Sequence, residues 1–328
     1  MHKVNIGLYG TNGHQIQNLL RDHPDARIIA VAAFAPATVS DDLKSAGVKV
    51  YNTLEQLLAD GEIHMVSLCS PMRADQANDA IQSLEAGMHV YAEKPCALLA
   101  ADVDRIIATS HRTGRFFHEQ ASTVFDQPYC TLRKIVDSGV LGTIVQVYTQ
   151  KSYPWFDQRP QDERVDGGLA TQAGVYNARF VEHVAHERIK SLTMKETTLG
   201  NPVAGGQCRR AVSMLMELEN GGLASAVSNY LCPAPPAWQK WGYETVRIWG
   251  TNGFVESIDN GRIGTLSLVG RACETLDFSE PGMNFLDSFI GEIRTGKRAI
   301  PLTLQDELSP TRWVVQAKER LGYATSAK

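Results

Sequence analysis

The chain has 328 residues, 43% of them apolar, and a formal net charge of −4 at pH 7. This length favours two domains of ordinary size, and the slightly acidic charge gives no support for nucleic acid as a partner. No run approaches the roughly 18 apolar residues of a membrane span. Residues 1–3 lead directly into the first apolar run and leave no room for a signal peptide, so we expect a cytoplasmic protein without a membrane partner.

The six cysteines are widely spread and include no C-x-x-C pair. In an intracellular chain this pattern indicates reduced, mostly buried thiols. His183 and His186 have the spacing of a metal pair, but no third ligand accompanies them. A solvated helix face is the favoured interpretation, and no metal site is predicted.

The first 120 residues alternate between strand and helix patterns. Short apolar runs predict strands at residues 3–9, 27–34, 64–69, 88–92 and 115–118. Apolar residues at helical spacing predict helices at residues 53–58, 74–86 and 102–109. Elements that alternate at this spacing form right-handed βαβ units, so we predict an α/β dinucleotide-binding domain with a Rossmann-like parallel sheet over residues 1–120.

A glycine turn follows the first strand. The turn consists of Gly10, Thr11, Asn12, Gly13 and His14. Apolar residues at helical spacing follow it, and strand, glycine turn and helix together aim backbone N–H groups at a pyrophosphate. The match to G-x-G-x-x-G is imperfect, because Asn12 and Gln15 replace two glycines. The same tetrapeptide recurs at residues 250–253 between two strand-like runs, where it predicts a hairpin.

The segment Glu93-Lys94-Pro95 follows the apolar strand at residues 88–92. A lysine at the carboxyl end of a buried parallel strand lies where open α/β sheets bind ligands. Its ammonium can donate a proton or polarise a substrate oxygen, and Glu93 can orient or neutralise it. An isolated tripeptide of this kind is usually a surface feature, whereas the nucleotide-binding pattern before it favours a functional lysine.

The pattern changes after residue 120. Long two-sided strands are predicted at residues 143–153, 189–198, 211–219, 223–230, 245–249 and 253–258. The turn at residues 220–222 indicates antiparallel neighbours, and helices are predicted at residues 282–295 and 304–321. We therefore predict an α+β domain with a large, mostly antiparallel open sheet over residues 121–328, which binds substrate and forms oligomers.

With these features the chain resembles the glucose-fructose oxidoreductase, inositol dehydrogenase and rhizopine-catabolism protein (GFO/IDH/MocA) family. The similarity covers essentially the whole chain and is clearest in a spaced block formed by Ser70-Pro71, Ala74, Ala80, Leu84, Ala86-Gly87, His89-Val90 and Glu93-Lys94-Pro95. Members of the family use NAD or NADP to oxidise or reduce hydroxyl and carbonyl groups of sugars, polyols and related cyclic compounds. The resemblance implies that Lys94 lies beside the nicotinamide and the reacting hydroxyl. It also implies that Ser70, Pro71, Glu93 and the glycine turn contact the cofactor.

The second signature of the family falls on residues 167–177. It has two glycines, an Asp, and a His or Tyr four residues after that Asp. Residues four apart on a helix share a face, so Gln172 and Tyr176 are expected to point at one pocket with Lys94. The resemblance implies that Tyr176 relays a proton, with a pKa lowered by the ammonium of Lys94. Gln172 replaces the usual Asp and can hydrogen-bond a substrate hydroxyl, but it cannot accept a proton.

Departures from the family pattern leave the cofactor and the chemistry open. Ala33 ends the second strand, where NAD binders carry an acid for the ribose hydroxyls, and no nearby Arg suits the 2′-phosphate of NADP. Asp75 stands where many relatives have a His. Together with Asn12 and Gln172, Ala33 motivates a rival hypothesis, a redox-inactive sugar- or nucleotide-binding or regulatory protein on the same fold. A redox-neutral use of tightly held NAD is a further alternative.

Three other expectations concern surfaces and histidines. Loops at residues 153–165 and 232–243 are rich in aromatic residues and are expected to set substrate specificity. Alternate apolar residues at 211–230 fit burial on both faces of a sheet, and the resemblance implies a homodimer or homotetramer. His14 lies just after a predicted strand, and His118 ends another. For each of them, a position beside the cofactor and a purely structural role are equally favoured.

Overall fold

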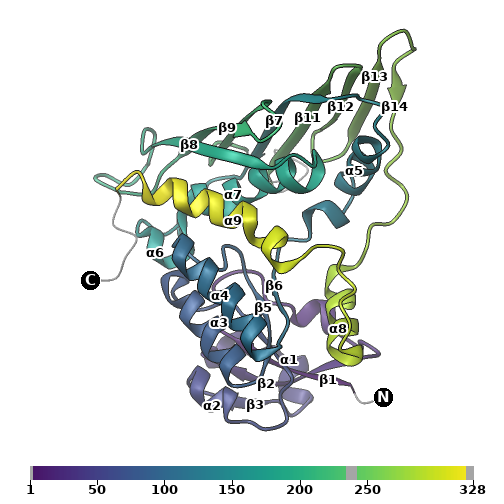
Figure 1. Ribbon diagram of the computed structural model, residues 1–328. Coiled ribbons are helices and arrows are strands. Elements are labelled where there is room, and N and C mark those ends of the chain that lie inside the picture. The colour runs from purple at the N-terminus through teal and green to yellow at the C-terminus, as the bar shows by residue number, and fades with distance from the viewer. Residues whose placement is uncertain (1–2, 234–241, 323–328) are drawn as a thin grey trace.

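The structure is a computed structural model that describes residues 3–233 and 242–322. A parallel-sheet domain forms the lower half of the molecule in Figure 1, and a broad second sheet forms the upper half. Helices α7 (Gly168–Arg179) and α9 (Leu304–Glu319) lie between the two sheets. The site described below lies where these two halves meet.

The lower sheet is parallel throughout. Its strands are β1 (Val4–Tyr9), β2 (Ala26–Ala32), β3 (Lys49–Tyr51), β4 (Met65–Leu68), β5 (His89–Ala92) and β6 (Phe117–Glu119), in the spatial order β3-β2-β1-β4-β5-β6. The α/β prediction is confirmed, and only the short edge strand β3 was missed. Strand order reverses between β1 and β4, which places a ligand crevice at their carboxyl ends.

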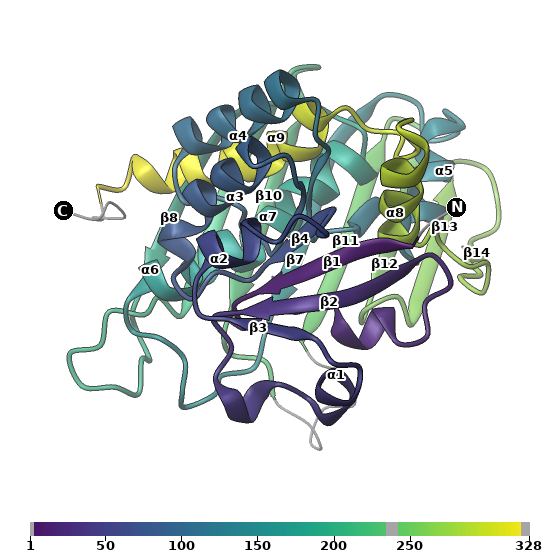
Figure 2. The same ribbon diagram turned by 90° about the horizontal axis from the view of Figure 1, so that it is seen from below.

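Helices cover both faces of this sheet, as the view from below in Figure 2 shows. One face carries α2 (Leu54–Leu58), α3 (Gln76–Glu85) and α4 (Ala100–Thr113), whose apolar residues pack against β4 and β5. The other face carries α1 (Asp41–Ser45) and the C-terminal helix α8 (Phe285–Thr295). The division at residue 120 therefore separates the two sheets, whereas α8 returns to the core of the first domain.

The helix expected after the glycine turn is not formed. In its place stands a four-residue 3₁₀ helix, Gln17–Leu20, in which only Leu20 is buried. Residues 10–25 link β1 to β2, and the glycine turn occupies the start of this link. Asp22 adopts a positive φ of 56° and Pro24 cannot continue a helix, so helical backbone ends before β2.

The upper sheet has eight strands. They are β7 (Ile144–Ser152), β8 (Ile189–Thr197), β9 (Ala211–Leu218), β10 (Leu223–Asn229), β11 (Tyr243–Gly250), β12 (Gly253–Ile258), β13 (Ile263–Leu268) and β14 (Glu274–Thr275). Their spatial order is β14-β13-β12-β11-β7-β10-β9-β8, and only the β7–β10 pair is parallel. The predicted antiparallel sheet is confirmed, including the hairpin at residues 250–253, while β13 and β14 were missed.

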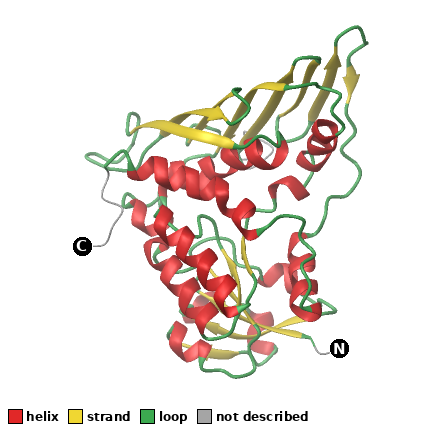
Figure 3. Cartoon of the chain, in the orientation of Figure 1, coloured by secondary structure: helices red, strands yellow, loops and turns green. Residues whose placement is uncertain are grey.

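Helices cover one face of the upper sheet. Figure 3 shows that, within the described residues, no helix covers the opposite face. Helices α5 (Tyr129–Asp137) and α7 bury the inner face, and side chains of β9 alternate strictly between buried and exposed positions. None of the helices in residues 3–233 and 242–322 is long and apolar enough to cross a membrane.

Candidate functional site

Lys94 stands directly after β5 at the carboxyl edge of the parallel sheet, and only 5% of its surface is exposed. Its ammonium lies 3.8 Å from the carboxylate of Glu93. Burial lowers the pKa of Lys94 to about 8, because desolvation outweighs the opposing charge of Glu93. Lys94 therefore changes charge close to neutral pH, as a proton-transferring group requires.

The glycine turn folds inward against Glu93. His14 donates its backbone N–H to the Glu93 carboxylate at 3.0 Å, and its imidazole lies 3.3 Å from the same group. Gly13 allows this approach, since a Cβ there would stand 2.6 Å from the Glu93 side chain. Burial would raise the pKa of Glu93, but the His14 hydrogen bond and the charges of Lys94 and Arg73 keep it below its usual value. Glu93 is therefore an anion held in the turn.

Asn12 ties the turn to the segment after β4 and to the second domain. Its amide donates to the carbonyls of Ser70 at 3.2 Å and Pro71 at 3.3 Å, and to that of Val165 at 2.5 Å. The structure thus brings together the predicted cofactor residues of the turn, Ser70, Pro71 and Glu93. The resemblance did not reveal that Asn12 also bridges the two domains.

The crevice fits a dinucleotide at its nicotinamide end, where the buried ammonium of Lys94 stands at the sheet edge. The pyrophosphate end differs from the expectation. Backbone N–H groups of Gly10, Asn12, Gly13 and His14 already donate to Ala32, Cys69, Thr11 and Glu93. The four-residue 3₁₀ helix supplies no helix N-terminus. At the adenosine end Ala33 offers no carboxylate and adopts a positive φ of 55°.

Helix α7 places Tyr176 at the crevice, and Gln172 lies one turn earlier on the same helix. Gln172 uses its amide to donate to the backbone carbonyl of Asp166 at 2.9 Å. The ring of Tyr176 lies 5.7 Å from the Lys94 ammonium, measured to the ring centre. The expected lowering of the Tyr176 pKa is not found: burial raises that pKa well above its usual range, and Tyr153 adds to the effect. Tyr176 is therefore a neutral phenol at physiological pH.

A second lysine, missed by the sequence analysis, lies closer to Tyr176. The ammonium of Lys151, on β7, lies 4.0 Å from the centre of the Tyr176 ring. Lys151 forms an ion pair with Glu244 on β11, and the hydroxyl of Tyr129 also donates to Glu244. The sequence did contain a signal for Lys151. It occupies a position of β7 that faces the interior, where an apolar residue is normally found.

Lys151, Tyr176, Glu244 and Tyr129 line a cavity of about 420 Å³ between the two domains. Its remaining walls come from the glycine-turn segment, the end of β5 and the segment after β6: His14, Gln15, Ile16, Leu19, Tyr91, Gln120, Ala121, Ser122, Thr123, Asp126 and Gln127. This volume suits a small ligand. The cavity therefore combines a lysine, three phenols and two carboxylates with His14 of the turn that was expected to bind cofactor.

The other histidines are structural. His118 is fully buried, and its two ring nitrogens lie 2.8 Å from Glu292 and 2.7 Å from Glu307. His183 is buried against the carbonyl of Asp306, whereas His186 is exposed beside Asp137. The solvated helix face predicted for this pair is therefore not found, because the helix ends in a π-helical turn at Phe180–Val184 that buries His183 and leaves His186 exposed. No cluster with three potential metal-binding side chains occurs in the described part of the chain.

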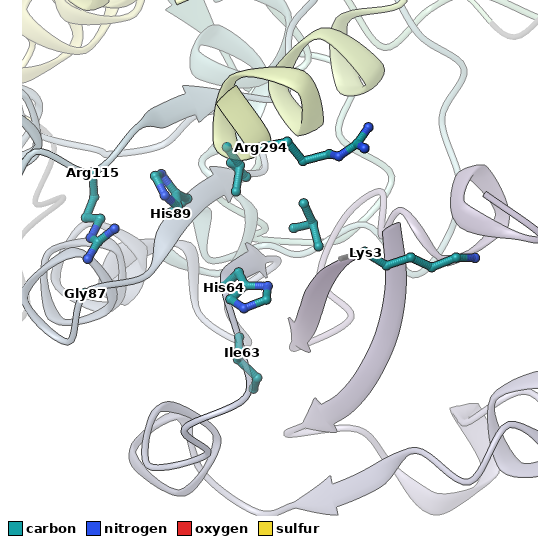
Figure 4. A pocket seen from close by; sticks show the side chains of 9 residues that line it. Lys3, Ile63, His64, Gly87, His89, Arg115 and Arg294 are labelled. Carbon is teal, nitrogen blue, oxygen red and sulfur yellow. The ribbon is translucent and has the colours of Figure 1, made fainter. Parts of the chain in front are cut away.

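A cavity of about 430 Å³ lies at the opposite edge of the parallel sheet (Figure 4). Its walls include His64, His89 and Arg115 near the amino ends of β4, β5 and β6. The long side chains of Lys3 and Arg294 turn away from its centre; Lys3 donates to the carbonyl of His23, and Arg294 pairs with Asp25. None of the expected site residues reaches this cavity.

Two family models match the chain. Residues 4–120 match an oxidoreductase family with an NAD-binding Rossmann fold, and residues 129–256 match the GFO/IDH/MocA C-terminal domain. The chain belongs to the GFO/IDH/MocA oxidoreductase family. Residues 4–120 thus match an NAD-binding Rossmann domain of this family, and the recognition made from the sequence is confirmed.

Individual members of this family have low sequence identity to this chain. The inositol 2-dehydrogenase of Salmonella typhimurium is 28% identical over 148 residues, which cover 44% of this chain and 43% of that protein. The 1-carboxy-3-chloro-3,4-dihydroxycyclohexa-1,5-diene dehydrogenase of Comamonas testosteroni is 25% identical over 181 residues, covering 54% of this chain and 44% of that protein. These matches therefore span less than half of either relative.

The fold is shared more completely. An aldose-aldose oxidoreductase from Caulobacter crescentus, solved with glycerol, superposes with a TM-score of 0.80 at 19% identity. The superposition covers 97% of this chain and 98% of that one. At this identity the likeness establishes the two-domain fold, and the chemistry has to be argued from the residues of this chain.

Proposed function

We propose that the chain is an NAD(P)-dependent oxidoreductase that transfers a hydride between nicotinamide and a hydroxyl or carbonyl group of a sugar, polyol or related cyclic compound. The observation that carries this proposal is the buried ammonium of Lys94 at the sheet edge, with a pKa of about 8. Relatives support the substrate class, since their names give a cyclic polyol and a carboxylated cyclic diol as substrates.

Nicotinamide, when bound, supplies the hydride donor or acceptor. Lys94 holds or moves the proton at the oxygen of the reacting hydroxyl. Tyr176 acts as its neutral relay partner, and Lys151, paired with Glu244, lies against the same phenol ring. Gln172 is assigned to substrate orientation. Burial of Lys94 keeps bulk water away from its ammonium.

A redox-inactive binding protein is the second candidate, and the glycine turn favours it. Four backbone donors of that turn are engaged within the protein, and Ala33 provides no ribose contact. Under this alternative the cavity still binds a small molecule, but turnover is absent. We also propose that the molecule forms a homodimer or homotetramer and is cytoplasmic, as expected from the sequence.

The deciding experiment is a fluorescence titration of the purified chain with NADH and with NADPH, followed by assays of sugars and polyols. Micromolar binding of either cofactor is the expected result, and the stronger binder names the cofactor. Lys94→Met should lower kcat by roughly 10²–10⁴-fold while leaving cofactor affinity nearly unchanged. Binding of neither cofactor at millimolar concentration, by folded protein free of retained nucleotide, would favour the binding protein.

A further inference from the structure

Two buried arginines meet beside the crevice. Arg159 lies in the loop after β7, and Arg210 directly precedes β9; they are 5% and 8% exposed. The guanidinium of Arg159 lies 3.5 Å from the centre of the Tyr230 ring, and that of Arg210 lies 4.3 Å from the centre of the Trp155 ring. Trp155 and Tyr230 are themselves in edge contact, at 6.2 Å between ring centres, so the four side chains form one cluster.

Neither guanidinium in this cluster has a carboxylate partner. Within residues 3–233 and 242–322, no ion pair involves Arg159 or Arg210. Other buried cations of the same domain are paired: Lys318 lies 2.7 Å from Glu163, and Arg179 lies 2.5 Å from Glu119. A buried charge is normally retained with a counter-ion, so two adjacent unpaired arginines call for an explanation beyond packing.

Hydrogen-bond donors of the cluster are also unused. The Nε atoms of Arg159 and Arg210, the indole N–H of Trp155 and the hydroxyl of Tyr230 are buried without an acceptor among the described residues. The one side-chain hydrogen bond of the two arginines runs from Arg159 to the carbonyl of Pro154 at 3.2 Å. Four donors and two positive charges in one place match the chemistry of an oxyanion, which accepts several charge-assisted hydrogen bonds.

The cluster adjoins the reacting end of the crevice. Tyr153 begins the loop that carries Trp155 and Arg159, and the Lys94 ammonium lies 5.9 Å from the centre of the Tyr153 ring. Burial raises the pKa of Asp166, while the charges of both Arg159 and Lys94 oppose the rise, so this carboxyl is within electrostatic range of both cations without forming an ion pair with either. Asp166 also accepts, through its backbone carbonyl, the hydrogen bond from Gln172.

We propose that Arg159 and Arg210 form a subsite for an oxyanion, a carboxylate or a phosphate, carried by the substrate whose hydroxyl meets Lys94. Trp155 and Tyr230 hold the two guanidinium planes and contribute further donors. The substrate class is thereby narrowed to acidic or phosphorylated sugars, polyols or cyclic hydroxy compounds. This inference rests on the proposed function for its placement beside Lys94, while binding of the anion can be tested without turnover.

The test is calorimetric titration of the full chain, with and without NADH, using sugar acids, sugar phosphates and their neutral parents. D-glucuronate, D-glucose 6-phosphate and D-glucose form one such set. We expect at least one anion to bind roughly tenfold or more tightly than its neutral parent. Comparison of the sugar acids with the sugar phosphates shows whether the subsite prefers a carboxylate or a phosphate. A panel in which no anion outbinds its parent overturns the proposal.

Variants locate the effect. Arg159→Gln and Arg210→Gln should each remove the preference for the anion, whereas Arg271→Gln, at an exposed arginine, should keep it. Arg159→Lys keeps the charge without the fork of donors and should recover part of the preference, which separates recognition from folding. Retained preference in both glutamine variants overturns the subsite. Anion binding without turnover would leave the subsite standing and reject the oxidoreductase proposal.

Discussion

The ammonium of Lys151 lies 4.0 Å from the centre of the Tyr176 ring, whereas that of Lys94 lies 5.7 Å away. The family signature pairs Tyr176 with Lys94, but of these two lysines Lys151, on β7, lies nearer to its ring. Lys151 is held by Glu244, which also accepts from Tyr129. The relay proposed for Tyr176 therefore includes a charged pair that belongs to no recognised motif of this chain.

Lys151→Met should lower kcat by roughly 10- to 100-fold, because the phenol loses the nearest positive charge that favours its ionised form. NADH affinity should be unchanged, since Lys151 belongs to the second domain. Steady-state kinetics and a fluorescence titration measure the two effects. Lys190→Met, at an exposed position of β8, is the matched control. Equal turnover in the two variants would remove Lys151 from the mechanism.

Oxidation should become faster as the pH rises through about 8. Burial lowers the pKa of Lys94 to about that value, and the neutral amine present above it accepts the proton of the substrate hydroxyl. A pH profile of kcat/KM between pH 6.5 and 9.5 tests this expectation. Lys94→Arg stays protonated over this range and should lose the rise. A flat wild-type profile would contradict the assignment.

Ala33→Asp should strengthen NADH binding by about tenfold and weaken NADPH binding. The new carboxylate can accept hydrogen bonds from the ribose hydroxyls and repels a 2′-phosphate. Asp also tolerates the positive φ of 55° at this position better than Ala. Ala33→Gly relieves the same backbone conformation without adding a carboxylate, so its cofactor affinities should match the wild type. Identical titrations of the Asp and Gly variants would place the adenosine elsewhere.

The stabilisation contributed by His118 should fall as the pH rises toward 9, whereas Lys94, with a pKa lowered to about 8, contributes in the opposite direction. Burial alone would lower the pKa of His118, but Glu307 and Glu292 override it and raise that pKa to about 9. The stabilisation is complete below the unfolded pKa of about 6.5 and is lost through pH 9, a decrease in the free energy of unfolding of about 3 kcal/mol. Burial lowers the pKa values of His89 and His183, so these two groups change the stability only below about pH 6.5.

Urea unfolding of the wild type and of His118→Gln at pH 7 and pH 9 isolates the His118 contribution, which should make the change between these pH values about 2 kcal/mol less favourable in the wild type than in the variant. His118→Gln should be less stable at pH 7, because two buried carboxylates lose their cation, and it should show little further loss at pH 9. An equal pH dependence in the wild type and the variant would show that other groups cause the change.

Leu215→Lys should weaken self-association. Leu215 is 54% exposed at an outward position of β9, and Leu223 on the neighbouring strand β10 is 47% exposed. Light scattering at micromolar concentration should report a dimer or tetramer of the 36.0 kDa chain for the wild type and smaller particles for the variant. A wild-type monomer would show that this face stays in solvent.

Local patterns predicted most of the fold. Strand and helix periodicity gave five of the six parallel strands and six of the strands in the upper sheet, because burial repeats every two or about 3.6 residues within one element. The missing helix after the glycine turn shows the limit of such patterns. Apolar residues 16, 19 and 20 have helical spacing, but the turn folds inward against Glu93, and Asp22 and Pro24 end helical backbone before β2.

The sequence by itself determined the family, the two sheets and the position of Lys94 at the end of β5. These features depend on residues that are close together in the chain, so their spacing can be read directly from the sequence. The tertiary structure alone decided which distant residues meet: Lys151 with Glu244, His118 with Glu292, and Arg159 with Tyr230. Such contacts depend on strand register and on packing between the domains, which fix the burial and charge of each group and hence its chemistry.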